Sequence, residues 1–290
     1  MSDIAAGTKP RVSVVIVNWR ALNDTLAAIE SLILQTYQPH RIYIVDNGSA
    51  DGSLQQLETA CAGLFDVTVL ANSENLGFGG GCNRGLTEAL TDGCAFVWLL
   101  NNDASPVPDC LDALMSKAME APNAGMVGSW LTNPDQPSHD HAGSWMRPWL
   151  LSCRLVQTTH DLERHPYSWV TAASVLIRNE AILESGLFDE AFFMYWEDAD
   201  LAMRIRSAGY GITIAKDARV VHRAGTSSAA IPVQRYLWHL RSQGRWLRKH
   251  HSHPTFAQLL LNAKYLLKAV IDRDARRFKA LVHSMLHPGR

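Results

Sequence analysis

Short apolar runs alternate with amphipathic stretches between Val12 and Val221, and this alternation constrains the fold more than any other feature of the chain. Each apolar run suits one buried strand, and in the stretch after the first run Leu22, Leu26 and Ile29 recur at helical spacing. In chain order the pairs are residues 12–17 with 22–35, 42–45 with 51–61, 67–70 with 78–90, and 96–100 with 108–119. Repeated strand–helix units predict an α/β fold with a mostly parallel, doubly wound sheet and flanking helices.

The pattern is less regular after residue 120. Residues 132–148 are rich in Pro, Asn, Asp and His, which predicts a long loop, and such loops are often functional lids. Residues 169–177 predict a strand, and residues 178–185 and 198–208 predict short helices. In the first helix, Asn23 or Asp24 is placed to cap the amino-terminal end.

Charge is divided unevenly along the 290 residues. Residues 1–230 contain 15 Lys and Arg against 26 Asp and Glu, a net charge of −11, whereas residues 231–290 contain 12 against 2, a net charge of +10. The composition changes after residues 225–228. We therefore expect an α/β domain over residues 1–230 and a basic amphipathic helical appendage over residues 231–290. A basic tail suggests an anionic partner, which can be a membrane surface, nucleic acid or the chain's own acidic face.

The cysteines and the first ten residues bear on the compartment. The five cysteines form no C-x-x-C pair and no zinc spacing, and they predict reduced packing residues. Residues 1–10 lack the basic and apolar regions of a signal peptide, and no apolar run approaches the length that spans a bilayer. We expect a cytoplasmic protein.

Three polar segments follow predicted strands or an aromatic run. The run 96–100 stops at Asn101, Asn102 and Asp103, and a carboxylate at the carboxyl end of a strand lies where an open α/β sheet binds ligands. A hard cation that bridges to phosphate oxygens needs such a carboxylate. His222 ends another strand, although a lone histidine is more often structural. Together with the acidic residues 197–200, these side chains can converge on one metal–phosphate site.

The second predicted strand leads directly into Asp46, and Asp51 follows five residues later. An acid at a strand end can accept the imide proton of a pyrimidine, and the second acid can reach ribose hydroxyls. A β-to-α turn with Asp51 as the helix cap also explains Asp51 and Gly52, but it explains Asp46 less well.

Glycines follow the third strand at residues 77 and 79–81. No G-x-G-x-x-G fingerprint is present there or after Asn18, which argues against a dinucleotide fold. The glycine segment is either a helix entry whose backbone amides approach a phosphate or a plain turn.

The aromatic residues 192–196 precede Glu197 and Asp198. Packed around a carboxylate, they exclude water and raise its pKa, as a general base requires. The alternative is that both acids occupy the first turn of a helix, where the helix dipole favours them.

In this order the motifs resemble family 2 glycosyltransferases of the GT-A fold, over roughly residues 12–225. Within the family they are most similar to rhamnosyltransferases that build bacterial surface polysaccharide. The segments that carry the resemblance are residues 14–19, 46–53, 75–83, 100–103, 188–190 and 196–201.

The resemblance implies a nucleotide-sugar donor site. Asp46 contacts the pyrimidine, Asp51 contacts the ribose, and Asn75 with Gly77 lies in the loop beside the diphosphate. The other residues assigned to this site are Asn18 and Asn102.

The resemblance also implies a metal site and a base. Asp103 and His222 hold Mg²⁺ or Mn²⁺, and Asp198 is the catalytic base. Asn101 stands where many members have an Asp, so the metal has one carboxylate fewer. Residues 171–174 lack the glycine that relatives place near the acceptor cleft.

The expected function is inverting, metal-dependent transfer of a sugar from a nucleotide diphosphate sugar to a glycan or lipid-linked glycan. Rhamnose from dTDP-rhamnose is the expected donor, and a UDP-hexose is the alternative. The alternative from another functional class is a non-catalytic sugar-nucleotide or glycan-binding module, but such a module would give Asp198 no function. No nucleic-acid recognition motif accompanies the basic tail. Its amphipathic helices predict a peripheral position on the inner face of the cell membrane, and the alternative is that their apolar faces pack on the core and their charges are solvated.

Overall fold

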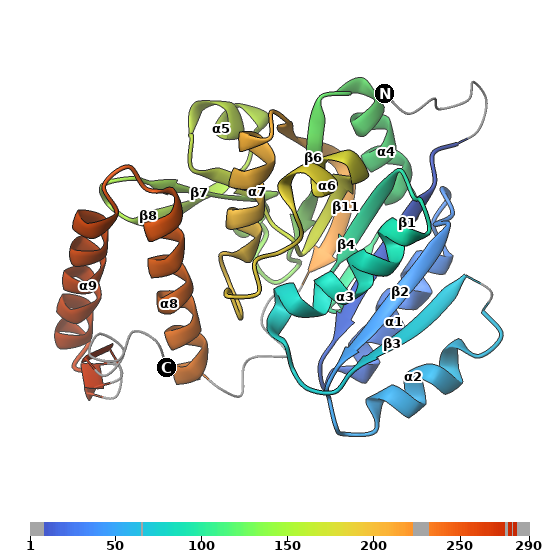
Figure 1. Ribbon diagram of the computed structural model, residues 1–290, viewed down its shortest axis with the longest axis horizontal. Helices are drawn as coiled ribbons and strands as arrows, with labels where there is room; N and C mark the ends of the chain where they lie inside the picture. Colours follow the sequence, from blue (N-terminus) through green and yellow to red (C-terminus); the bar gives the residue numbers. More distant parts are fainter. Residues whose placement is uncertain (1–8, 65, 223–231, 276–277, 280, 283–290) are drawn as a thin grey trace.

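A mixed eight-stranded sheet forms the centre of the molecule (Figure 1). The computed structural model describes residues 9–64, 66–222, 232–275, 278–279 and 281–282. The four strands that begin the chain's α/β units pair in parallel, and the next in space, β10, runs antiparallel to both of its neighbours. In spatial order the strands are β3 (Val67–Asn72), β2 (Arg41–Asn47), β1 (Val12–Asn18), β4 (Phe96–Leu100), β10 (Ser174–Arg178), β6 (Ala124–Thr132), β11 (Gly211–His222) and β5 (Ala104–Pro106).

Helices cover both faces of this sheet because side chains alternate along each strand. On β1, Val14 and Ile16 face one apolar cluster and Val15 faces the other. The first cluster packs under α1 (Leu22–Ile33), α2 (Ser53–Cys61) and α4 (Cys110–Glu120). The second packs under α3 (Gly77–Thr91), α6 (Asn179–Ser185) and α7 (Glu197–Ser207). The α/β fold and its mostly parallel sheet are as predicted.

The start of α1 differs from the prediction. The N-cap is Ala21, which makes no side-chain capping hydrogen bond, while Asn23 and Asp24 lie inside the first turn. The preceding residue Arg20 has a φ of 54°, and its backbone N–H donates to Ser49 Oγ. This tight turn brings the chain into the helix at Leu22, before either predicted cap.

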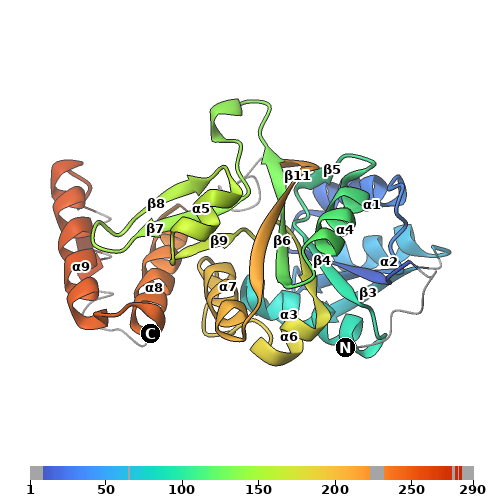
Figure 2. The ribbon, with the colours of Figure 1, turned by 90° about the horizontal axis from the view of Figure 1, so that it is seen from above.

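The prediction of one long loop over residues 132–148 is wrong. After the short 3-10 helix η1 (Pro137–His139), residues Gly143–Arg147 form strand β7, which pairs with β8 (Ser152–Val156) and β9 (Ser168–Val170). A Cβ on Gly143 would lie 2.0 Å from the carbonyl oxygen of Trp169, so glycine is what permits this pairing. In Figure 2 the small sheet and helix α5 (Thr159–Arg164) lie between the main sheet and the two carboxyl-terminal helices.

The single strand predicted over residues 169–177 is also divided. Its first part belongs to β9 of the small sheet and its second to β10 of the main sheet. Between them, Thr171 to Ala173 turn toward the ligand-binding edge of the main sheet, where Ala173 O accepts a hydrogen bond from Asn101 N. The run is mostly apolar, so its composition does not indicate where the chain passes from the small sheet to the main sheet.

All five cysteines are free thiols. Four of them are buried, as expected for packing residues, whereas Cys153 on β8 is exposed.

Two basic helices follow the described part of the α/β region, α8 (Pro232–His250) and α9 (Pro254–Ile271). The expected boundary at residues 230 and 231 falls outside the described residues. Figure 1 shows α8 alongside α7, with α9 on its outer side. None of the helices in the described ranges is long and apolar enough to cross a membrane.

A buried carboxylate joins α7 to α8. Asp200 is fully buried, and its oxygens lie 2.8 Å from Arg204 Nε, 2.8 Å from Lys249 Nζ and 2.7 Å from His250 Nε2. We call these four residues the Asp200 cluster. Burial by itself raises the pKa of Asp200, but the hydrogen bonds from His250, Lys249 and Arg204 outweigh it and lower the pKa to about 2. Since the folded pKa lies below its ordinary value of 3.8, the cluster stabilises the fold at neutral pH and loses this contribution as pH falls from about 4 toward 2.

We expect Asp200→Asn to destabilise the protein by about 3 kcal/mol, because it removes the charge at the centre of a buried cluster and leaves Arg204 without its carboxylate and Lys249 with Asp189 alone. The melting temperature would fall by roughly 6 °C or more. Glu120→Gln is the control, because it breaks an exposed pair with Lys117 whose contribution is about 0–1 kcal/mol. Equal melting temperatures for the two variants would contradict a structural role for the Asp200 cluster.

Candidate active site

A cavity of about 450 Å³ opens at the carboxyl ends of the parallel strands, where α/β sheets bind ligands. Residues from β1, β2, the start of α3, the end of β4, the segment before α7 and the first turns of α8 line it. Six of the nine predicted site residues lie on its wall: Asn75, Gly77, Asn102, Asp103, Asp198 and His222. Asn18, Asp46 and Asp51 lie off this wall.

The predicted metal residues meet at one side of the cavity. Strand β11 pairs antiparallel with β5, which places His222 opposite Ala104. As a result, His222 Nε2 lies 3.1 Å from Asp103 Oδ1 and 3.4 Å from Asn101 Nδ2, although the residues are about 120 positions apart in sequence.

The donor atoms at this side suit a divalent cation. Asn101 Oδ1 is buried without a hydrogen-bond partner, beside the carboxylate of Asp103 and the imidazole of His222. Carboxylate and amide oxygens are ligands of Mg²⁺ and Mn²⁺, and imidazole nitrogen also binds transition metals. Among the described residues no group of three or more His, Cys, Asp or Glu side chains could hold a metal, so phosphate oxygens of a ligand would have to complete this site.

Asn18 and Asp46 lie side by side at the ends of β1 and β2, which pair in register. Asp46 is only 2% exposed, and its Oδ1 accepts hydrogen bonds from Asn18 Nδ2 at 2.8 Å and Ser49 Oγ at 2.6 Å. Its Oδ2 accepts from the backbone N–H of Ser49 at 3.2 Å. Thr25 links Asn18 to Asn102 by hydrogen bonds of 2.8 and 3.2 Å. The contact between Asp46 and a pyrimidine stays a prediction, and in this conformation Asp46 braces the turn.

Asp51 is exposed at the start of α2, outside the cavity wall. Its Oδ1 accepts a hydrogen bond from Ser53 N at 3.0 Å, so the side chain also supports the helix start, although Gly52 is the N-cap. The hydrogen bonds from the Ser53 hydroxyl and backbone lower the pKa of Asp51 and keep it ionised.

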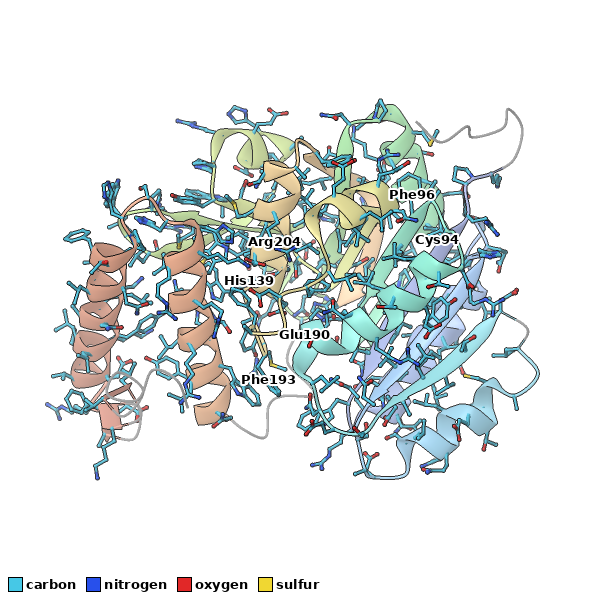
Figure 3. All side chains as sticks on the ribbon, in the orientation of Figure 1. Cys94, Phe96, His139, Glu190, Phe193 and Arg204 are labelled. Atoms are coloured by element: carbon cyan, nitrogen blue, oxygen red, sulfur yellow. The ribbon has the colours of Figure 1, made fainter. Side chains whose placement is uncertain are left out.

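The loop before α3 is held by Asn47, which sequence reasoning did not select. Asn47 Nδ2 donates to Asn75 Oδ1 at 3.1 Å and to the Gly77 carbonyl at 2.9 Å. Gly77 has a φ of 78°, and a Cβ there would lie 2.2 Å from the Phe193 carbonyl oxygen. Glycine is therefore required where the loop meets the segment that leads into α7. Figure 3 labels Phe193 of that segment, between α3 and α8.

Asp198 lies on the α7 side of the cavity. Its Oδ2 accepts from Ala172 N at 3.3 Å and its Oδ1 from Ala199 N at 2.8 Å. Burial raises the pKa of Asp198 to about 6, and the hydrogen bonds from Ala199, Ala172 and the Thr171 side chain limit the rise. Aromatic rings lie near this side of the cavity: Trp196 packs against Trp169 and Trp246, each with a centroid distance of 5.3 Å, and Trp169 and Trp196 line the cavity together with Asp198.

Glu197, next to Asp198, is 7% exposed, and its Oε2 has no hydrogen-bond partner. Burial and the neighbouring charge of Asp198 raise the pKa of Glu197 well above its ordinary value, which favours its neutral form. The backbone of Tyr195 and Trp196 is left-handed, with φ values of 68° and 69°, and this turn starts α7 at the cavity wall.

Arg235, Trp238 and His239 on α8 also line the cavity. Arg235 Nε donates to the Tyr195 hydroxyl at 2.9 Å, and Trp238 packs against Phe193 with ring centroids 4.8 Å apart. Sequence reasoning placed these residues in a separate appendage, and their spacing of three and four positions was the available signal that they share one helix face.

A family model described as glycosyl transferase family 2 matches residues 13–178. The chain belongs to this family. It is 30% identical to N-acetylglucosaminyl-diphospho-decaprenol L-rhamnosyltransferase of Mycobacterium tuberculosis, in an alignment that covers 88% of this chain and 92% of that protein. This glycosyltransferase is thus similar to a rhamnosyltransferase over nearly its whole length.

Two solved structures show the same fold. GalNAc-T7 with UDP, GalNAc and Mn²⁺ is 16% identical with a TM-score of 0.66, and the match covers 86% of this chain and 49% of that one. Mannosyltransferase PcManGT from Pyrobaculum calidifontis, in complex with GDP-Man and Mn²⁺, is 18% identical with a TM-score of 0.60 over 98% of this chain and 77% of that one. The chain spans about half the length of GalNAc-T7. These similarities confirm the GT-A fold.

We expect the transfer rate to fall about tenfold per pH unit below about pH 6, because a base must be unprotonated and burial raises the pKa of Asp198 to about 6. Thr171→Val removes a hydrogen bond that favours the charged carboxylate, so it should move this acid limb to higher pH. The profile of kcat against pH measures both effects.

Two further variants complete this test. Asp198→Asn should lower kcat by about 10²–10⁴-fold while nucleotide affinity is retained. Thr91→Val is the control, since Thr91 is exposed at the end of α3, outside the cavity wall, and its hydroxyl donates to the Thr87 carbonyl within the same helix. Unchanged turnover in Asp198→Asn would remove Asp198 from the role of base.

Proposed function

We propose that this protein is an inverting, metal-dependent rhamnosyltransferase that uses dTDP-rhamnose and a lipid-linked glycan acceptor. The observation that carries the proposal is the arrangement of one cavity, with the half-buried carboxylate of Asp198, whose pKa is raised to about 6, on the α7 side and the Asp103–His222 pair at the carboxyl end of β4. The long similarity to a rhamnosyltransferase supports the choice of sugar and acceptor.

The reaction exchanges one bond at the anomeric carbon. The acceptor oxygen bonds to that carbon from one face, the bond to the diphosphate oxygen breaks on the other, and the acceptor proton passes to Asp198. Trp169 and Trp196, which line the cavity with Asp198, would limit the access of water to this transfer. A divalent ion held by Asp103 and His222 would neutralise the charge on the leaving diphosphate.

A thermal-shift series tests the donor. A ligand at 100 times its dissociation constant stabilises a protein by about 2.7 kcal/mol, so we expect dTDP and dTDP-rhamnose to raise the melting temperature more when Mn²⁺ or Mg²⁺ is present. UDP, GDP and their sugars are the comparison.

The alternatives predict different responses. A metal-dependent response to UDP-hexose alone would assign the other donor, and no response to any nucleotide would contradict the proposal. A donor that binds with no transfer to any glycan would favour a binding module.

We propose further that α9 rests on an anionic membrane surface, which would bring the enzyme to a lipid-linked acceptor. The outer side of α9 carries large apolar residues that are 57–69% exposed, namely Phe256, Leu259, Leu267, Val270 and Ile271. Exposed Lys268 and Arg273 lie beside them, so apolar contact and attraction to anionic headgroups would act together.

Vesicle flotation tests this membrane proposal. We expect binding to phosphatidylglycerol vesicles, weaker binding at high salt, and a loss of binding in Ile271→Glu, which places a carboxylate on the apolar stripe. Leu183→Glu is the matched control, because Leu183 is 67% exposed on α6, outside α9. Binding that ignores lipid charge, or that survives Ile271→Glu, would count against the proposal.

A further inference from the structure

Helix α8 presents one polar and aromatic face to the catalytic cavity. Arg235, Trp238 and His239 are spaced by three and four residues, which places them on the same side of the helix. Contacts fix this face: Trp238 packs on Phe193, and His239 lies against the ring of Tyr195 with centroids 5.8 Å apart. The Asp200 cluster holds the other end of α8 on α7.

Arg235 is the charged group of this face. Its Nε donates to the Tyr195 hydroxyl at 2.9 Å, which orients the guanidinium, and among the described residues no carboxylate forms an ion pair with it. Burial lowers the pKa of His239 to about 4, so His239 is neutral at pH 7 and adds no charge. A guanidinium without a carboxylate partner in a partly enclosed cavity is suited to a phosphate.

The position of Arg235 in the cavity indicates which phosphate it would meet. The loops at the ends of β1, β2 and β4, with Asp103 and His222, form one side of the cavity. Arg235 instead contacts Tyr195, three residues before Asp198. In an inverting transfer the acceptor approaches from the side of the base and away from the leaving diphosphate, and the contact of Arg235 with the Tyr195 turn that leads into Asp198 favours the acceptor's phosphate as its partner.

We propose that Arg235 binds the phosphate adjacent to the sugar of a lipid-diphosphate-linked acceptor, and thereby distinguishes such an acceptor from a phosphate-free glycan. This inference rests on the proposed function. One sugar ring then spans the space between the hydroxyl activated at Asp198 and the anomeric phosphate at Arg235. Arg235 is a specificity-determining residue in this account, whereas Asp198 performs the proton transfer.

The experiment compares two acceptors that differ only in phosphate. One is N-acetylglucosamine linked through diphosphate to a short prenyl chain, and the other is N-acetylglucosamine on an alkyl chain without phosphate. In Arg235→Ala we expect kcat/KM for the diphosphate acceptor to fall about 10- to 100-fold, as for loss of a hydrogen bond to a charged group. The value for the phosphate-free acceptor and the affinity for dTDP should stay as in the wild type, and Arg235→Lys should recover part of the loss.

Two variants separate charge from structure. Tyr195→Phe removes the hydroxyl that orients Arg235 but keeps the guanidinium, so it should preserve the preference for the diphosphate acceptor. Arg245→Ala is the matched control, because Arg245 is exposed on the same helix and lies over the Phe192 ring, outside the cavity wall. If Tyr195→Phe loses the preference as completely as Arg235→Ala, the role of Arg235 is structural and the proposal is overturned.

The same series distinguishes failure of this inference from failure of the proposed function. Equal losses with both acceptors, or weaker dTDP binding in Arg235→Ala, would assign Arg235 to packing or to the donor and overturn the inference alone. If the wild type transfers sugar to neither acceptor, the proposed acceptor class is wrong. Binding of the diphosphate acceptor, followed by tryptophan fluorescence with dTDP present, then decides the inference: an unchanged dissociation constant in Arg235→Ala overturns it.

Discussion

The pairing of the buried Asp200 carboxylate with residues of α7 and α8 is the interaction on which the arrangement of the cavity depends. It contacts Arg204 on its own helix and Lys249 and His250 on α8, with all three distances below 3 Å. A carboxylate removed from water is stable only when it is paired in this way, so α7 and α8 are coupled by electrostatics as well as by packing. The coupling matters because both helices supply residues to the cavity.

The cavity combines two parts with different origins. The first is built at the strand ends of the α/β sheet, where backbone pairing sets Asn18 beside Asp46 and His222 beside Asp103. The second is built by α7, α8 and the Tyr195 turn, and it holds a carboxylate whose pKa burial raises toward neutrality. Helix α8 of the basic carboxyl-terminal region therefore lines the same cavity as the strand ends, and the change of net charge along the chain does not separate the residues of the cavity.

The neighbouring acids 197, 198 and 200 show how one short motif is divided among three tasks. The pKa of Asp200 is lowered to about 2, that of Asp198 is raised to about 6, and that of Glu197 is raised well above its ordinary value. The residue types and their spacing in the sequence do not distinguish these cases. What separates them is the environment: Arg204, Lys249 and His250 for Asp200, backbone N–H groups for Asp198, and an unpartnered buried oxygen for Glu197.

The sequence by itself determined the α/β class, the family and six of the residues at the cavity wall, because alternating periodicity and short motifs are local properties of the chain. It could not determine where residues 169–177 change sheets, that residues 143–147 pair as a strand, or that Arg235 reaches Tyr195. Apart from the hairpin of β7 and β8, those features depend on contacts between segments tens of residues apart. Only the tertiary structure decided them, because the free energy of such contacts arises from packing, burial and charge pairing that no local pattern contains.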